Sequence, residues 1–342
     1  MTSDERDPEA AFALQGEVRG PWRAYLDGLE PLRPELHRYC TRLTGSVWDG
    51  EDLAQDALMK VFSLLGKIDA DLEQPRAYLI RTATTLFIDR QRRLARARAW
   101  LEGERAEPAE VAPDAGAELE QRQRVRAAGG ELLQRLAPRE RAALMLKDVF
   151  DLSLEESASV LRTTVGAVKA ALHRGRGRLS DPERDGPAPA AAPPAEVIDR
   201  YIAAMAAADL EAIRAICSED VCVELVGGNE MEGLAQSKGF FKYAHMALPQ
   251  LGFGDNPNWR PAEYRGEPIV LGFRTLEGAE GLNEVHRLEL DEGRIARVRC
   301  YCFAPDTLRV LGEHLDLPVL PRRYRSPDPA EVQAVLAAMN NG

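Results

Sequence analysis

The sequence predicts a multidomain protein in which two all-α domains, the second with a helix-turn-helix, precede an α+β domain. Three observations lead to this prediction. Apolar residues recur at helical spacing through the first half of the chain, two stretches of linker composition interrupt the helices, and short runs of strand character follow residue 195. The 342 residues are enough for two or three domains.

The overall composition is that of an ordinary globular chain, with 45% hydrophobic and 29% charged residues. No apolar run reaches the roughly eighteen residues of a membrane span, and Met1–Ala10 has no signal-peptide core. The five cysteines include no CxxC pair, which fits reduced thiols better than a disulfide framework. We therefore expect a cytoplasmic protein without membrane contact.

Charge is distributed unevenly along the chain. The net charge of −11 argues against a nucleic-acid-binding protein, but residues 76–98 carry seven Arg and one acid. Residues 162–178 carry five cations and no acid, whereas residues 102–120 carry seven acids and one base. Two basic patches joined by an acidic connector favour a nucleic-acid partner, although each patch alone also fits a solvated helix face.

Residues 21–98 are expected to be helical, and the helical spacing is seen from Asp49 to Leu65. The apolar side chains of this stretch recur every three or four residues, and acids at its start suit the positive end of the helix dipole. Gly66–Gln74 interrupts the pattern. Pro75 is well placed as the first residue of a second helix, which buries Leu79 and Leu86 and displays arginines.

Two stretches have the composition of linkers. Residues 100–118 are rich in Ala, Glu, Pro and Gly and lack periodicity, and residues 182–195 are dominated by Pro and Ala. The predicted domains are a helical domain at 20–99, the acidic linker at 100–118, a second helical domain at 119–181, the Pro/Ala linker at 182–195, an α+β domain at 196–317 and a C-terminal arm at 318–342.

A helix-turn-helix is predicted in the second helical domain. Leu154–Leu161 and Val165–Leu179 have helical spacing and are separated by a short turn. On the second helix Val168 and Leu172 share the apolar face, and the opposite face carries small residues flanked by cations. Small side chains let a helix enter the major groove, where cations meet phosphates or guanine edges. An amphipathic helix pair in any bundle has a similar pattern.

This segment resembles conserved region 4 of the sigma-70 family. The motifs are Leu136-Ala137-Pro138-Arg139-Glu140-Arg141, Leu152-Ser153-Leu154-Glu155-Glu156, Val165-Gly166-Ala167-Val168-Lys169 and Leu172-His173-Arg174-Gly175-Arg176-Gly177-Arg178-Leu179. Arg162 stands where the family usually has a turn glycine, Ser157 replaces an aliphatic residue, and Ala170 and Ala171 replace a frequent Ser and Arg. Gly175 and Gly177 should each weaken the helix by about 1 kcal/mol relative to Ala.

Region 4 of the family reads the −35 promoter element and meets the β flap of RNA polymerase. We expect Arg174 to face away from the core and to be the leading base-reading residue. The resemblance implies −35 contacts from Thr164, Lys169, Ala170, His173, Arg174, Arg176 and Arg178.

An upstream segment resembles region 2 of the same family. Asp49-Gly50-Glu51-Asp52-Leu53-Ala54-Gln55-Asp56-Ala57-Leu58-Met59-Lys60-Val61-Phe62 is similar to region 2.2, which docks on the β′ clamp helices. Pro75-Arg76-Ala77-Tyr78-Leu79, Asp89-Arg90 and Arg92-Arg93 are similar to regions 2.3 and 2.4, which open and hold the −10 element. The loop Lys67–Gln74 corresponds to the capture site for a flipped base. Tyr78 and Phe87 are the nearby aromatic residues, and either could belong to the core.

The resemblance implies two sets of site residues in region 2. Contacts to the polymerase are expected from Asp49, Asp52, Leu53, Gln55, Asp56, Met59 and Phe62, with Asp52 and Asp56 on one exposed face. Contacts to the −10 element are expected from Arg76, Tyr78, Arg81, Asp89, Arg90, Arg92 and Arg93.

Two motifs in this order, about 100 residues apart, are more specific than either alone. They identify residues 20–180 as similar to the small extracytoplasmic-function (ECF, group 4) sigma factors, which lack regions 1 and 3. In the family the connector threads the polymerase towards the RNA path. The acidic linker here could imitate an RNA backbone or be an ordinary solvated linker.

Residues 196–317 resemble the SnoaL-like branch of the nuclear-transport-factor-2 (NTF2) fold, in which helices precede a long curved antiparallel sheet around a pocket. The resemblance rests on Tyr201–Leu210, Val221–Val226 and Glu232-Gly233. The expected secondary structure comprises helices at Val197–Ala208 and Leu210–Cys217, strands at Val221–Val226, Arg260–Tyr264, Ile269–Phe273, Glu284–Leu290 and Ile295–Phe303, and a hairpin turn at Asp291–Arg294.

The acid–base candidates of this domain are Glu224, His245, Glu284 and His286, of which Glu224, Glu284 and His286 are the candidate pocket residues. Glu284 and His286 alternate along a strand and share a face, as do Cys300 and Cys302. Both pairs also fit ordinary core or surface positions. We expect no catalytic residue, metal or cofactor.

The function expected is that of an alternative sigma factor. Its partners are core RNA polymerase and promoter DNA, and the SnoaL-like domain acts as a built-in regulator through intramolecular contact. An isomerase or cyclase fused to a DNA-binding half is the alternative. A plain repressor would have no use for the region 2 motif.

Overall fold

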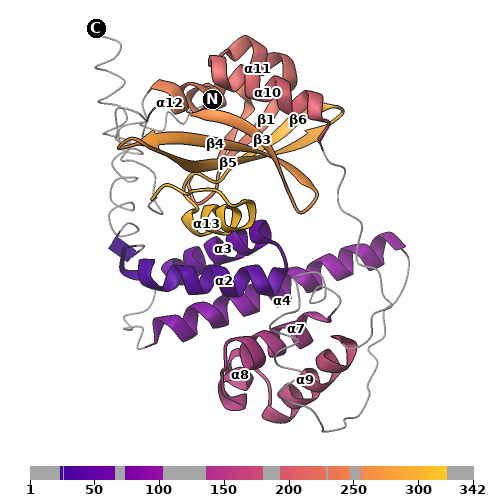
Figure 1. Cartoon of the computed structure of the whole chain (residues 1–342). Coiled ribbons are helices and arrows are strands. Elements are labelled where there is room, and N and C mark those ends of the chain that lie inside the picture. Colours follow the sequence, from indigo (N-terminus) through magenta and orange to yellow (C-terminus); the bar gives the residue numbers. More distant parts are fainter. Residues whose placement is uncertain are drawn as a thin grey trace, which may run out of the picture. The chain divides into compact units, whose positions relative to one another are not determined.

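The computed structural model describes residues 24–25, 27–65, 74–102, 136–179, 193–228, 230–246, 255 and 257–321. The chain forms two compact units, Met1–Pro187 and Ala188–Gly342 (Figure 1). Among the described residues, none of the helices combines the length and apolar character that a bilayer crossing requires. Most of the Lys67–Gln74 loop, the two linkers and the C-terminal arm lie outside the described residues, as does the side chain of His245.

The described part of the first unit is helical, as predicted. Its elements are η1 (Glu30–Leu32), α2 (Arg33–Thr44), α3 (Val47–Leu65), α4 (Pro75–Glu102), α7 (Pro138–Leu144), the π-helical turn η2 (Met145–Val149), α8 (Leu154–Val160) and α9 (Val165–Leu179). Pro75 begins α4, and Ser153 caps α8 by accepting from the Glu156 backbone N–H at 3.0 Å. The turn between α8 and α9 completes the expected helix-turn-helix.

One hydrophobic core joins α2, α3 and α4 to α7, α8 and α9. Phe87 is buried in it, so this aromatic residue belongs to the core, and Tyr78 packs against it half-buried. Tyr39 of α2 meets Phe150, just after η2, edge to face with ring centroids 5.1 Å apart. Arg141 of α7 donates to the Leu43 carbonyl oxygen at 3.1 Å. Each of these pairs joins α2 to the second group of helices, and we call Tyr39–Phe150 and Arg141–Leu43 the bridging pairs.

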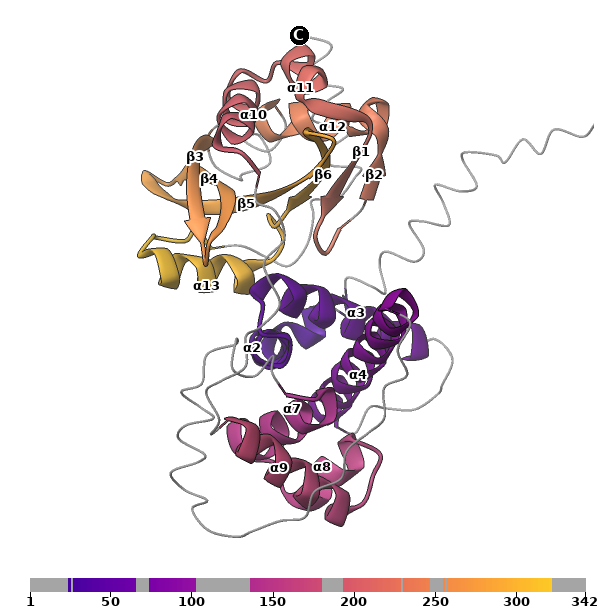
Figure 2. The ribbon, with the colours of Figure 1, turned by 90° about the vertical axis from the view of Figure 1, so that its right-hand side faces the viewer.

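The second unit is an α+β unit. Its described elements are α10 (Ala195–Ala207), α11 (Leu210–Ile216), β1 (Cys217–Leu225), β2 (Glu230–Glu232), α12 (Gly233–Met246), β3 (Asn258–Tyr264), β4 (Glu267–Leu276), β5 (Ala279–Asp291), β6 (Arg294–Cys300) and α13 (Pro305–Leu315). Helices α10, α11 and α12 cover one side of the sheet, and α13 lies on the other (Figure 2).

The sheet has the strand order β2-β1-β6-β5-β4-β3. An entirely antiparallel sheet was expected, and this prediction is wrong at one place, because β1 pairs with β6 in parallel. The two strands are joined through the whole domain, so local pattern cannot report their direction. The predicted turn between β5 and β6 is confirmed, and Glu292 and Gly293 adopt φ of 48° and 78°, as a tight hairpin requires.

Candidate promoter- and polymerase-binding surfaces

The solvent side of α9 presents small and polar residues. Thr164 begins it, and its Oγ1 accepts from the Ala167 backbone N–H at 3.2 Å, which caps the helix. Gly166, Ala167 and Lys169 are exposed. Ala170 and His173 continue the same surface half-buried. This is the side of the helix that the sequence assigns to the major groove.

The arginines of α9 lie differently from the prediction. Arg174 donates from Nε to Glu140 Oε1 at 3.0 Å, and Arg178 donates from Nη1 to Glu140 Oε2 at 2.7 Å. Glu140 is 3% exposed, and α7 holds it under α9. The expectation that Arg174 faces away from the core is therefore wrong, because a buried carboxylate needs cationic partners and draws this side chain back.

Arg176 makes a second internal ion pair. Its Nη2 and Nε donate to Asp148 at 2.7 and 3.0 Å, and Asp148 is 0% exposed. Such a bidentate pair holds the guanidinium firmly on η2. Gly175 allows α9 to pack closely on α7, because a Cβ at this position would lie 2.7 Å from Leu144 Cδ1. Sequence patterns did not identify Glu140 and Asp148 as partners of the α9 arginines, because a pair between residues far apart in the chain leaves no local sequence signal.

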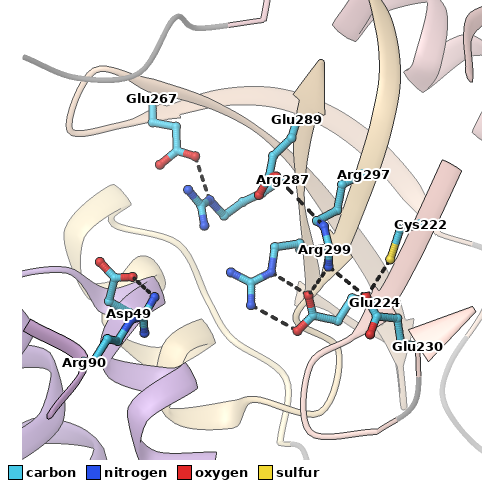
Figure 3. A network of polar contacts seen from close by, with 10 residues as sticks. All are labelled: Asp49, Arg90, Cys222, Glu224, Glu230, Glu267, Arg287, Glu289, Arg297 and Arg299. Atoms are coloured by element: carbon cyan, nitrogen blue, oxygen red, sulfur yellow. Dashed lines mark hydrogen bonds and ion pairs between the residues drawn. The ribbon is translucent and has the colours of Figure 1, made fainter. Parts of the chain in front are cut away.

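The arginines at the middle of α4 are by contrast exposed. Arg90, Arg92 and Arg93 project from one stretch of the helix beside the exposed Asp89. Their ion pairs are long: Arg90 lies 3.6 Å from Asp49 (Figure 3), and Arg92 lies 3.8 Å from Asp89. Exposed pairs at such distances contribute little to stability, so these cations remain available to an anionic partner.

The first turns of α4 are engaged within the unit. Arg76 binds both carboxylate oxygens of Glu35, with Nε donating to Oε2 at 2.8 Å. This hydrogen bond lowers the pKa of Glu35. Arg81 is half-buried and donates to Ser159 Oγ of α8 at 2.9 Å. The expected −10 contacts of Arg76 and Arg81 therefore compete with internal partners.

The α3 surface predicted for the polymerase is partly exposed. Asp49, Asp56 and Met59 are exposed, and Asp52 is half-buried. Phe62 is half-buried against the Tyr25 ring, with centroids 5.3 Å apart.

Two residues of α3 do not fit the surface prediction. Leu53 is 2% exposed and lies in the core, so its assignment to the polymerase surface is wrong. Gln55 donates to Glu51 Oε1 at 2.7 Å. Glu51, predicted as a helix-start acid, is fully buried, with Arg33 Nη2 at 2.5 Å and His37 Nε2 at 3.4 Å from its carboxylate oxygens.

Comparison with known proteins supports both motifs. Family models match the chain as sigma-70 region 2 at residues 29–97 and as sigma-70 region 4 at residues 130–179. ECF RNA polymerase sigma factor SigD of Mycobacterium bovis is 33% identical over 193 residues, which cover 50% of this chain and 86% of SigD. The chain belongs to the ECF RNA polymerase sigma factor family. It is thus a transcription initiation factor and not an enzyme, and sigma factors act by binding core RNA polymerase and promoter DNA.

Other similarities extend into the second unit. SigG of Mycobacterium tuberculosis is 28% identical over 314 residues, covering 82% of this sigma factor and 81% of SigG. The crystal structure of SigJ from the same species has a TM-score of 0.31 at 23% identity and covers 83% of this chain and 98% of that one. The crystal structure of an NTF-2 like protein from Burkholderia xenovorans has a TM-score of 0.25 at 14% identity. The match covers 41% of this chain and 90% of that one. The second unit has the architecture expected from the resemblance to the NTF2 fold, with helices α10 and α11 before a six-stranded sheet, and we call it the NTF2-like unit.

The candidate pocket residues of this sigma factor are divided between the two faces of the sheet. Glu284 and His286 are buried on the side of α10, with His286 Nε2 3.5 Å from Glu284 Oε2. Glu224 lies on the opposite face, where Arg299 binds both of its oxygens at 2.8 and 3.0 Å and Arg297 donates at 3.1 Å (Figure 3). The prediction that Glu224 joins the pocket is wrong, because Val221 and Val223 take the inward positions of β1.

Proposed function

We propose that this sigma factor alternates between a closed arrangement and a polymerase-competent one, and that its NTF2-like unit is a built-in regulator of that equilibrium. The bridging pairs, Tyr39–Phe150 and Arg141–Leu43, are the observation that supports this proposal. Regions 2 and 4 share one hydrophobic core, Tyr39 packs on Phe150, and Arg141 donates to Leu43 across it. The two promoter-reading regions are therefore fastened to each other in this structure.

The spacing of the promoter elements limits what the closed arrangement can bind. Elements centred about 25 base pairs apart are separated by roughly 80 Å along B-DNA. A unit in which regions 2 and 4 share a core cannot reach both elements at once. Binding to the promoter then requires that Tyr39 and Phe150 part and that Arg141 release the Leu43 carbonyl oxygen.

The internal partners of the arginines agree with a closed arrangement. Arg81 of region 2 binds Ser159 of region 4, and Arg76 is held by Glu35. Burial lowers the pKa of Arg141 to about 10. Opening returns this guanidinium to water, which offsets part of the packing that is lost.

The Pro/Ala linker at 182–195 joins the NTF2-like unit to the sigma regions. A tether of this length gives an effective concentration of around millimolar, so a weak intramolecular interface is well occupied. An interface that favours one arrangement by about 1–3 kcal/mol changes the active fraction several-fold or more. In the open form we assign α3 to the β′ clamp helices, region 4 to the β flap and −35 element, and the α4 arginines to the −10 element.

Reconstituted transcription with core polymerase tests the regulator. The full chain is compared with chains truncated after Asp181 and after Leu317, at equal concentration on one promoter. The first lacks the NTF2-like unit and the second lacks only the C-terminal arm. We expect the first truncation to differ from the full chain several-fold in initiation. Equal activity of all three chains over a range of core polymerase concentrations contradicts a regulatory role.

Docking of α3 on core polymerase is tested separately, by charge reversal with a matched control. Asp52→Lys with Asp56→Lys reverses two charges on the α3 surface and should abolish co-purification with core polymerase. Retained co-purification means that α3 is not the docking helix. Glu211→Lys with Glu313→Lys carries the same change in charge on the second unit and should leave co-purification intact.

A further inference from the structure

A cluster of three metal-ligating side chains lies inside the NTF2-like unit. Glu284 and His286 belong to β5, and Cys300 ends β6. The sheet register places His286 directly opposite Cys300. One ligand atom from each residue lies within 4.8 Å of the others, and all three residues are buried. The bulged pairing of β4 with β5 at Gly272 and Phe273 lies next to this place in the sheet.

His286 is held so that one nitrogen points into the cluster. Its Nδ1 shares a 2.8 Å hydrogen bond with the Tyr201 hydroxyl, and its ring packs against Trp259 with centroids 4.7 Å apart. Its Nε2 is buried and has no hydrogen-bond partner among the described residues. The 3.5 Å from Nε2 to Glu284 Oε2 is too long for a good hydrogen bond.

Glu284 presents one oxygen to the cluster and the other to a cation. Its Oε1 lies 3.4 Å from the guanidinium of Arg274, whereas its Oε2 lies 3.8 Å from Cys300 Sγ. Gly272 provides the space for this carboxylate, since an added Cβ would lie 2.6 Å from Glu284 Cγ. Oε2 thus faces both the imidazole nitrogen and the thiol.

We propose that His286 Nε2, Glu284 Oε2 and Cys300 Sγ bind a zinc ion inside the NTF2-like unit. Zn²⁺ takes nitrogen, sulfur and carboxylate oxygen in tetrahedral geometry, with bonds of about 2.0–2.3 Å. Ligand atoms around such an ion are separated by roughly 3.3–3.7 Å. The observed separations of 3.5 and 3.8 Å are close to this range.

The surroundings of the three ligands fit a metal centre. A ligating histidine usually donates its other ring N–H to an oxygen, and the Tyr201 hydroxyl occupies that position. Arg274 orients the carboxylate through Oε1 and balances the negative charge that the thiolate and carboxylate bring. The mixed donor set excludes Ca²⁺ and Mg²⁺, which prefer oxygen alone.

Cys222, a half-buried cysteine of the same unit, serves as a matched control. Cys222 lies on the opposite sheet face, where its Sγ is 2.7 Å from Glu230 Oε1, beside Arg297 (Figure 3). Arg297 competes for the acid, since its Nη1 donates to Glu230 Oε1 at 3.0 Å. Cys222→Ser should therefore leave zinc binding unchanged.

Zinc content of the tag-free full chain tests the proposal. The protein is stripped with a chelator, reconstituted with ZnCl₂, freed of excess metal and measured by elemental analysis. We expect about one zinc ion per chain for the wild type and for Cys222→Ser, and less than about one tenth for His286→Gln and Cys300→Ser. Tyr201→Phe should retain the site but weaken zinc affinity roughly 10-fold or more, because the ring loses its orienting partner.

Cobalt substitution keeps the test decisive if the ligand variants fail to fold. Co²⁺ bound to the wild type should show thiolate-to-metal charge-transfer absorption, and zinc should displace it. A folded wild type, checked by circular dichroism, that retains no zinc overturns the proposal. Zinc retained in folded Cys300→Ser, or lost in folded Cys222→Ser, overturns the ligand assignment as well. None of these readouts depends on transcription, so they are separate from the regulatory role.

Discussion

The two basic helices of the sigma regions use arginine in opposite ways. On α9, Arg174, Arg176 and Arg178 all reach back to carboxylates buried beneath the helix, Glu140 and Asp148. On α4, Arg90, Arg92 and Arg93 extend from an exposed stretch with only long, solvent-exposed pairs. An arginine in a DNA-binding motif is therefore not automatically a DNA contact. An arginine whose carboxylate partner is buried stabilises the fold, whereas an arginine with only exposed partners can bind an anion.

The sharpest test of this difference is Arg176→Ala. The variant leaves the fully buried Asp148 without its bidentate guanidinium, which should lower the free energy of unfolding by about 3 kcal/mol. Arg92→Ala on α4 should change it by less than about 0.5 kcal/mol. Urea denaturation of the two full-length variants measures both effects. Equal stability of the two variants contradicts the division between fold-holding and exposed arginines.

A second test uses two glycines of α9 that look equivalent in sequence. Gly175→Ala should lower the free energy of unfolding by about 2 kcal/mol, because its Cβ would overlap Leu144 in the core. Gly177→Ala meets no atom within 4 Å and should stabilise the helix by up to about 1 kcal/mol. Thermal unfolding of the pair gives opposite shifts. Shifts of the same sign mean that α9 does not pack closely on α7.

These glycines mark the limit of sequence reasoning. The two motifs and the apolar periodicity predict the helices of the sigma half, and alternation predicts most of the β-strands. Periodicity assumes that charged residues are outside, so it could not find the buried Glu51, Glu140 and Asp148. A close helix approach at Gly175 depends on a partner helix that local sequence does not identify.

The NTF2-like unit shows the same limit. The pattern of β5 correctly places Glu284 and His286 on one face, because residues two apart on a strand must share it. Glu224 was assigned to the wrong face, since the parallel pairing of β1 with β6 and its inward register come from long-range contacts. The strand β2 and the helices α12 and α13 were not predicted.

The exposed arginines of α4 provide the third test. Arg90→Ala, Arg92→Ala and Arg93→Ala combined should weaken promoter binding by the holoenzyme by about tenfold or more and reduce its salt dependence, because up to three phosphate contacts are lost. Lys169→Ala on α9 should reduce the salt slope by about 1 across sequences. Electrophoretic mobility shifts at several salt concentrations measure both variants. An unchanged slope in the triple variant means that these cations do not touch DNA.

The smallest expected effect concerns the turn between α8 and α9. Arg162 adopts φ of 50°, a left-handed conformation that costs a non-glycine residue about 1 kcal/mol, at the position where the sigma-70 resemblance expects glycine. Arg162→Gly removes this strain but increases the entropy of the unfolded chain, so the net gain in unfolding free energy should be about 0.5 kcal/mol. Arg162→Ala removes the same cation and keeps the strain, so it should give no gain. Hydrogen exchange of α8 and α9 measures both variants. Equal protection of the amides in the two variants would mean that any gain in stability comes from the lost charge and not from the backbone. Arg162 would then resemble the exposed arginines of α4, whose effect is one of charge alone.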